Sequence, residues 1–185
     1  METELLTPRL RLRPWREEDL SSLVELFARP QLWHFPLRRG FTHDETGAFL
    51  RRMIDQQVAG TPCPFAAEER VGAQLIGYIG LSVPAFLPEV MPTVEIGWRL
   101  DPTSWGRGLA TEGARAVLAY AFETLGLEEL VSIFEPANEA SGRVMQRIGM
   151  HFDRDTNYPD AGPPLRVYRL SAQAWRSQLV TRPDR

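Results

Sequence analysis

Residues 94–125 read VEIGWRLDPTSWGRGLATEGARAVLAYAFETL, and this stretch decides the fold. The stretch begins within a mostly apolar run over 93–100, which is typical of a buried strand. Gly106 and Gly108 follow in a turn, and the next apolar residues repeat at helical spacing on one face: Ala114, Val117, Leu118, Ala121, Phe122 and Leu125. The stretch therefore predicts a strand, a glycine-rich turn and a long amphipathic helix.

The glycine turn has the composition of an anion-binding site. Glycine lets the backbone approach a ligand closely and adopt dihedral angles that a Cβ would forbid. Ala110 and Thr111 are small residues at the start of the helix, where the first amide groups have no partner within the helix. These amides and the positive end of the helix dipole favour a phosphate or pyrophosphate. The alternative interpretation is an ordinary tight turn into a core helix.

Two known phosphate-binding motifs fit this turn poorly. The P-loop requires a lysine, and all 21 basic residues of the chain are arginine. The dinucleotide motif G-x-G-x-x-G is partly matched by Gly106, Gly108 and Thr111, with Glu135 as a candidate ribose-binding acid. However, residues 101–105 separate the strand from the glycines, and only 79 residues follow Gly106, too few for a second half of a doubly wound sheet. A dinucleotide-binding protein is therefore the less favoured alternative.

Composition limits the function classes further. The chain has 185 residues, of which 43% are hydrophobic and 24% charged, so we expect a single domain over 1–175 and a flexible tail over 176–185. The formal net charge of -3 disfavours nucleic acid binding. One cysteine and three scattered histidines predict no metal site. No apolar run reaches the length of a signal peptide or membrane span, so we expect a cytoplasmic protein without membrane contact.

The rest of the chain predicts alternating helices and hairpins. Apolar residues at helical spacing indicate further helices over 20–27, from 42 to near Gly60, and over 138–148. Short apolar or alternating runs indicate strands at 10–12, 65–68, 75–82, 93–100, 130–134, 152–156 and 166–170. The predicted order, β-α-α-β-β-β-α-β-α-β-β, is that of a mixed α/β (α+β) fold with an antiparallel middle.

The glycine turn also resembles a known cofactor loop. Residues 105–110, WGRGLA, resemble the coenzyme A pyrophosphate loop of the GNAT acetyltransferases, R/Q-x-x-G-x-G/A. Gly108 and Ala110 take its two small positions, and Trp105 replaces the usual first polar residue, as is common in the RimJ/RimL branch of that superfamily.

Three further segments carry the same resemblance. Residues 7–13, TPRLRLR, resemble the N-terminal signature of the branch, and residues 94–98, VEIGW, resemble its central strand. Residues 138–150 resemble its last helix, so the resemblance spans about residues 5–175. It implies the GNAT fold, a mixed and mostly antiparallel central sheet with splayed central strands flanked by helices.

The resemblance implies acetyl-CoA as co-substrate, with the pantetheine arm between the splayed strands and the pyrophosphate on the loop. Arg107 either adds a positive charge there or is a solvated loop residue, and Trp105 either shields the cofactor or anchors the packing. Asn138 would cap the last helix and bond a pantetheine amide. The implied cofactor-binding residues are Trp98, Arg99, Leu100, Trp105, Gly106, Arg107, Gly108, Leu109, Ala110, Thr111, Asn138 and Ser141.

Two side chains are candidates for proton transfer. Glu95 interrupts an apolar strand just before the loop, where partial burial would raise its pKa toward that of a useful base; the alternative is a structural carboxylate paired with an arginine. Ser141 is the candidate acid for the leaving sulfur, because this chain has Met145 where many relatives have a tyrosine. Alternatively, Ser141 bonds the backbone of its own helix, and Tyr158 and Tyr168 are other available hydroxyls.

The acceptor site is expected in the connection Pro30–Phe41, whose aromatic residues include the candidate substrate contacts Trp33, His34 and Phe35. This apolar patch is either an acceptor cleft or the contact surface of a homodimer. The nearby arginine pairs at 38–39 and 51–52 are expected to lie on solvated faces. The alternative is that they contact the cofactor's 3′-phosphate or an acidic acceptor.

The expected function is an N-acetyltransferase that moves an acetyl group from acetyl-CoA to a primary amine by direct attack in a ternary complex. The acceptor is a protein or peptide N-terminus or a small-molecule amine. The alternatives are a coenzyme A-binding or sensing module that has lost catalysis, the dinucleotide-binding protein, and a scaffold that binds proteins through its aromatic patch.

Overall fold

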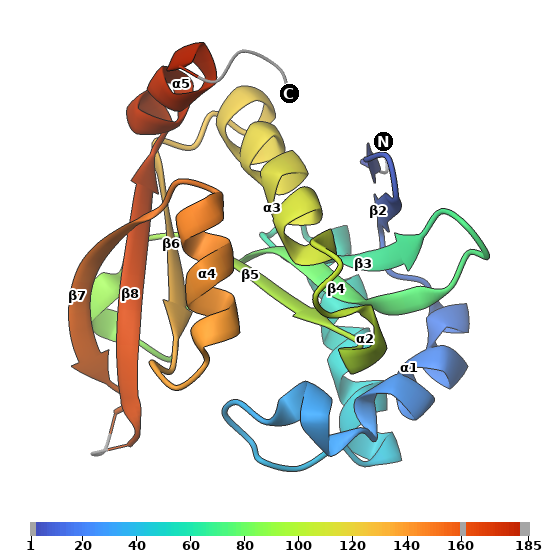
Figure 1. The fold of residues 1–185 in the computed structure, drawn as a ribbon. Coiled ribbons are helices and arrows are strands. Elements are labelled where there is room, and N and C mark those ends of the chain that lie inside the picture. Colours follow the sequence, from blue (N-terminus) through green and yellow to red (C-terminus); the bar gives the residue numbers. More distant parts are fainter. Residues whose placement is uncertain (1–2, 160–161, 182–185) are drawn as a thin grey trace.

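The computed structural model describes residues 3–159 and 162–181 (Figure 1). In this part of the chain, eight strands form one sheet in the order β1-β2-β3-β4-β5-β6-β8-β7. The strands are β1 (Leu5–Leu6), β2 (Leu10–Arg13), β3 (Pro64–Glu69), β4 (Leu75–Ser82), β5 (Glu95–Leu100), β6 (Glu129–Phe134), β7 (His151–Asn157) and β8 (Pro164–Ser171). The α-helices are α1 (Leu20–Phe27), α2 (His43–Val58), α3 (Leu109–Ala119), α4 (Glu139–Arg147) and α5 (Ala172–Thr181).

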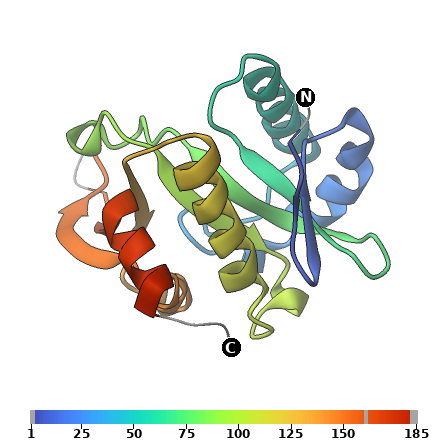
Figure 2. The ribbon, with the colours of Figure 1, turned by 90° about the horizontal axis from the view of Figure 1, so that it is seen from above.

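The helices cover both faces of the sheet (Figures 1 and 2). Side chains along β4 point alternately to the two faces of the sheet. Ile79 belongs to the apolar cluster under α3 and α4, whereas the neighbouring Tyr78 packs on the cluster of α1 and α2. Leu10 and Leu12 extend the first cluster to β2. The predicted mixed, mostly antiparallel sheet flanked by helices is therefore confirmed.

The central strands β5 and β6 separate soon after they meet. They are the parallel pair of the sheet, and a single register pair, Glu95 with Val131, joins them in the described residues. A backbone bond from Val131 to Val94 supports this point of contact. The next amide on β6, that of Ile133, bonds the side chain of Glu95 instead of the β5 backbone. The strands then diverge (Figure 1), which matches the expected splay.

The sheet topology contradicts the dinucleotide-binding alternative. A doubly wound sheet needs parallel strands before the glycine turn, but β4 pairs antiparallel with β5 from Gly77–Leu100 to Ser82–Glu95. Residues 101–105, which separate strand from glycines, form a short 3-10 turn over Pro102–Ser104. Its N-terminus is capped by Asp101, whose carboxylate accepts a bond from the Thr103 amide at 2.9 Å.

The C-terminal segment differs from our expectation. We predicted a flexible tail from residue 176, but α5 continues to Thr181. The reason is packing: Ala172 and Trp175 are buried, and the Trp175 ring lies 5.4 Å from that of Phe122. Gln178 then donates a bond to the Gly149 carbonyl at 3.0 Å, which joins the helix to the turn after α4. The remainder of the predicted tail, 182–185, lies outside the described residues. Within the described part of the chain, no helix combines the length and apolar character needed to cross a membrane.

Candidate active site

The glycine turn presents the open N-terminus of α3. Gly106 and Gly108 have φ angles of 73° and 78°, in the left-handed region that favours glycine. An added Cβ at Gly106 would meet no neighbouring atom, so the turn leaves space above the backbone. The first bond of the helix runs from the Glu112 amide to the Gly108 carbonyl at 3.0 Å. The amides that precede it, those of Leu109, Ala110 and Thr111, are therefore available to an anion.

Side chains around the turn hold it in place. The Arg107 guanidinium binds the Glu69 carboxylate on β3 at 2.7 and 2.8 Å, and the Arg107 carbonyl accepts a bond from Arg9. Trp105 donates its ring N–H to the Leu100 carbonyl at 2.7 Å while 55% of the residue stays exposed. This bond occupies the carbonyl of Leu100, one of the residues that the resemblance implies for cofactor binding. Trp105 thus anchors the turn and also leaves an exposed aromatic surface beside it.

The strand β5 borders the gap with its backbone. The Trp98 side chain packs against the apolar cluster under α3. Arg99 points to the opposite face, where it bonds the Tyr78 hydroxyl at 3.0 Å and lies 4.3 Å above the Trp33 ring. An added Cβ at Gly97 would meet no atom within 4 Å, so the face of β5 between Glu95 and Arg99 is open. The residues around Trp98 can therefore contact a ligand in the gap through backbone groups.

A basic groove runs beside the first turns of α3. Its lining includes Gly108 and Thr111 from the predicted cofactor site and three arginines, Arg9, Arg115 and Arg147. Arg9 is paired with Glu112, whereas Arg115 bonds the Arg147 carbonyl at 3.2 Å. The sequence did not indicate these arginines, because they come from three segments, the β1–β2 connection, α3 and α4, that only the tertiary structure brings together.

Glu95 lies where β5 and β6 separate. Its carboxylate accepts bonds from the Ile133 amide at 3.3 Å and the Ser82 hydroxyl at 3.5 Å, and the side chain is largely buried. Burial raises the pKa of Glu95 from its ordinary 4.5 to about 7, against the lowering effect of these two bonds. Neither bonding partner is charged, which disagrees with the alternative of a carboxylate paired with an arginine.

The N-terminus of α4 lies next to the end of β6, where the Asn138 amide donates a bond to the Glu135 carbonyl at 2.7 Å. Asn138 caps the helix, as expected, and its side chain accepts a bond from the Ser141 amide at 3.3 Å. The Ser141 hydroxyl makes no hydrogen bond to another described residue, so the alternative of a backbone-bonded serine is not what the structure has. Met145, one turn further along, is buried in the core.

The two candidate tyrosines differ in environment. Tyr168 is buried and packs edge-on against Phe134, as a core residue does. Tyr158 is half-buried beside the strands β6 and β8. Burial raises the pKa of Tyr158, and the negative charges of Glu135 and Glu95 raise it further. Tyr158 therefore lies close to both carboxylates.

The connection between α1 and α2 brings the predicted acceptor residues to different places. Trp33 is 5% exposed and stacked on Phe41 with ring centroids 3.8 Å apart, so its ring is part of the core and offers little surface to a substrate. His34 is exposed and Phe35 is partly exposed. The adjacent Arg38 reaches across to the end of β6 and pairs with a buried glutamate.

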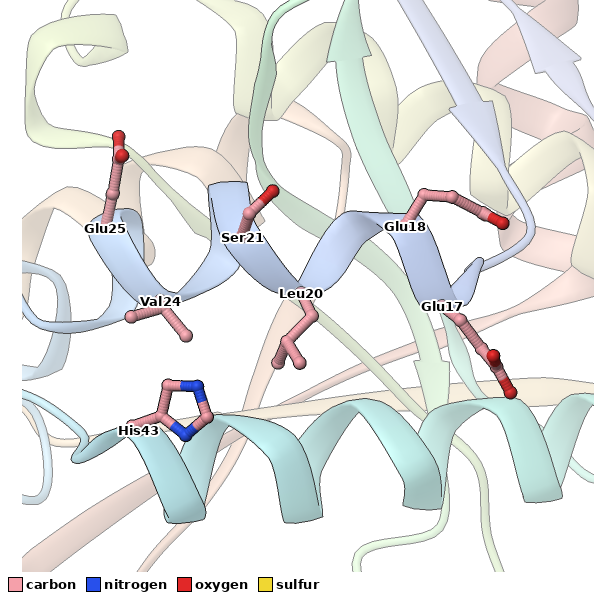
Figure 3. A pocket seen from close by; sticks show the side chains of 7 residues that line it. All are labelled: Glu17, Glu18, Leu20, Ser21, Val24, Glu25 and His43. Atoms are coloured by element: carbon pink, nitrogen blue, oxygen red, sulfur yellow. The ribbon is translucent and has the colours of Figure 1, made fainter.

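A second groove lies between α1 and the start of α2 (Figure 3). It contains none of the residues predicted for the cofactor, catalysis or acceptor, and it lies on the helices rather than at the strand gap. Its lining is Glu17, Glu18, Leu20, Ser21, Val24, Glu25 and His43. Among the residues that the structure describes, no cluster of three or more histidine, cysteine, aspartate or glutamate side chains could hold a metal ion.

Comparison with known proteins agrees with this geometry. Residues 9–151 match the family model of the acetyltransferase (GNAT) domain. The FsC-acetyl coenzyme A-N(2)-transacetylase of Aspergillus fumigatus is 32% identical over 168 residues, which cover 86% of this chain and 70% of that protein. An acetyltransferase from Agrobacterium tumefaciens has a solved structure with a TM-score of 0.72 and 31% identity, covering 91% of this chain and 94% of its own.

A structure of the ribosomal-protein-S5-alanine acetyltransferase from Vibrio fischeri has the same fold, with a TM-score of 0.74 over 94% of this chain and 98% of that chain at 15% identity. The family match covers most of the chain and includes the glycine turn, β5 and Ser141. The chain therefore belongs to the GNAT acetyltransferase family and is an N-acetyltransferase with acetyl-CoA as its donor.

Proposed function

We propose that the protein acetylates the primary amine of a small molecule or peptide, and that the amine attacks directly in a ternary complex. The observation that carries this proposal is the position of Glu95. Its carboxyl group lies where the two central strands separate, and burial raises its pKa to about 7. A base with a pKa near neutrality can accept a proton from an ammonium group and still be ionised often enough to act.

The residues around the gap fit acetyl-CoA. The amides at the start of α3 and the positive-φ glycines form a cradle for the pyrophosphate, and Gly97 leaves the β5 backbone accessible. Arg115 and Arg147 are candidates for a further phosphate, because their groove adjoins Gly108. When bound, acetyl-CoA supplies a thioester, which is the acyl donor.

Glu95 has the task of making the acceptor nucleophilic. An amine is mostly protonated in neutral water and has no free lone pair in that state. The Glu95 carboxylate, held by the Ile133 amide and the Ser82 hydroxyl, takes a proton from the acceptor either directly or through a water molecule. The neutral nitrogen that results is the nucleophile that amide formation requires.

Ser141 has the complementary task of holding a proton for the leaving sulfur. Its hydroxyl is free of hydrogen bonds to other described residues, and it stands in the first turn of α4, the helix that follows β6. Tyr158 is the second candidate, because its half-buried hydroxyl lies near Glu95 and its raised pKa keeps it protonated at neutral pH.

A thermal-shift titration tests the donor, with acetyl-CoA beside NAD and ATP as controls. A ligand at 100 times its dissociation constant adds about 2.7 kcal/mol to the free energy of unfolding. For a domain of this size we expect a shift of roughly 5 to 10 °C with acetyl-CoA and none with NAD. Thiol release with a panel of amines then tests transfer. A shift with acetyl-CoA but no acetylated amine would replace this proposal with the coenzyme A-binding module.

A further inference from the structure

Glu135 is a buried carboxylate with one oxygen left without a partner. The residue directly follows β6 and is 5% exposed. Its Oε2 accepts a bond from the Arg38 guanidinium at 2.6 Å, but its Oε1 is buried and has no hydrogen-bond partner among the described residues. A buried, unpaired acceptor costs about 1 to 3 kcal/mol or more when charged, so native proteins rarely keep one without a use.

Glu135 and Glu95 lie on the same face of the sheet, at the ends of the two central strands that separate. Val131 pairs with Glu95, and side chains alternate along a strand, so residues 131, 133 and 135 share the face of Glu95. Tyr158 packs with Ile133 on that face, and the charges of both carboxylates raise its pKa in addition to burial. The Glu95 carboxylate reaches the amide of Ile133, and Glu135 lies two residues, or roughly 7 Å of extended chain, beyond that amide.

The group that covers Glu135 belongs to the connection between α1 and α2. Arg38 has a φ angle of 62°, which is uncommon for a residue with a side chain, and its guanidinium lies half-exposed over the Phe35 ring. The connection is tied to the end of β5 as well, through bonds from Arg99 to the Leu32 carbonyl and from Arg29 to Asp101. It therefore crosses the ends of both central strands, and Arg38 is its contact with β6.

We propose that Glu135 is a specificity-determining residue of the acceptor site, whose free carboxylate oxygen binds a second positively charged group of the amine acceptor. The proposal rests on the proposed acetylation of an amine and narrows its substrate class. The preferred acceptor carries a second cation, separated by several carbon atoms from the nitrogen that is acetylated. Diamines and other compounds with a second cationic group have this property, whereas simple monoamines do not.

The chemistry of the site favours a cation over a neutral group. A carboxylate has about four lone-pair sites, and Arg38 uses one of them. A second cation on Oε1 would satisfy the unpaired atom and form a charge-assisted bond in a buried place, where such bonds are strong.

The test compares putrescine, cadaverine and hexamethylenediamine with monoamines of the same carbon number, by thiol release in the presence of acetyl-CoA. We expect kcat/KM to be about tenfold to a hundredfold higher for the best diamine than for its matched monoamine, mainly through KM. The Glu135→Gln variant should lose this preference, because glutamine keeps the size of the side chain but not its charge.

Two control variants separate recognition from structure. Arg38→Gln breaks the same ion pair as Glu135→Gln but leaves the carboxylate, so it should retain the preference for diamines. Glu139→Gln removes a nearby exposed carboxylate on α4 and should behave as wild type. Glu135→Asp withdraws the carboxylate by one methylene and should move the optimum to a longer diamine, which a purely structural role would not do.

The outcomes distinguish the two proposals. Equal kcat/KM for diamines and monoamines in the wild-type protein would overturn the role of Glu135 and leave amine acetylation intact. Loss of the preference in both Glu135→Gln and Arg38→Gln would show that the ion pair only holds the connection in place, and would also overturn it. Failure to acetylate any amine despite acetyl-CoA binding would overturn the proposed function, and this inference with it.

Discussion

Replacing Glu95 with glutamine should stabilise the protein and inactivate it at the same time. Burial raises the pKa of Glu95 from 4.5 to about 7, so keeping the carboxyl ionised costs more in the folded protein than in the unfolded chain. The difference corresponds to about 3 kcal/mol if the group were fully shielded from water. Because part of the residue is exposed, we expect a gain of about 1 to 3 kcal/mol from the substitution above pH 7.

The direction of the pH dependence follows from proton binding. Between pH 4.5 and about 7 the folded protein keeps the Glu95 proton while the unfolded chain has lost it. The wild-type free energy of unfolding therefore falls as pH rises through this window. Glu95→Gln removes this contribution, so the two proteins should have similar stability near pH 4 and should differ most above pH 7.

The effect on catalysis has the opposite sign. Glutamine cannot accept the acceptor proton, and loss of a general base typically lowers the rate by about a hundredfold to ten-thousandfold. In the wild type, kcat/KM should rise with pH through an apparent pKa of about 7. In the variant this rise should be absent.

Urea unfolding at two pH values and thiol release across the pH range measure both effects. Glu89→Gln is the matched control, since it removes an exposed carboxylate from the segment before β5. An unchanged pH profile of kcat/KM would remove Glu95 from the role of base. A variant less stable than wild type above pH 7 would show that the carboxylate is stabilised, not strained, by its surroundings.

Three further substitutions test the turn, the acid and the fold. Gly108→Val places a residue with a side chain at a φ of 78°, which costs about 1 to 2 kcal/mol of conformational free energy. The substitution should weaken acetyl-CoA binding at least severalfold. An unaltered thermal shift with acetyl-CoA would contradict the role of the turn. Ser141→Ala should lower kcat about a hundredfold while the acetyl-CoA thermal shift is retained, and an unchanged kcat would transfer the acid role to another hydroxyl. Arg13→Met leaves the buried carboxylate of Asp19 without its cation and leaves the partly buried Glu68 with only the longer pair to Arg11, so urea unfolding should show a loss of about 3 to 5 kcal/mol. A loss below about 1 kcal/mol would mean that these carboxylates find other partners.

Local patterns in the sequence were enough to predict the glycine turn and the order of the elements from β2 to β8, but not β1 or α5. Helical and alternating periodicity depend on residues a few positions apart. Gly106 and Gly108 indicate positive φ angles, which other residues avoid. The position of Glu95 in an apolar strand also indicated a raised pKa. Its magnitude, however, depends on burial between β5 and β6 and on bonds from Ser82 and Ile133, which no local pattern contains.

The pairs that shape the site join residues far apart in the chain, and only the tertiary structure decided them. Arg38 and Glu135 are 97 positions apart, and the sequence suggested a solvated arginine for the first and at most a ribose-binding acid for the second. Trp33 was predicted to contact the substrate because its neighbours are aromatic, but its ring is buried in the core. The amino-acid sequence thus determined where the chain turns and to which family it belongs. Long-range packing determined which charges are buried, because burial depends on what the rest of the chain places around a side chain.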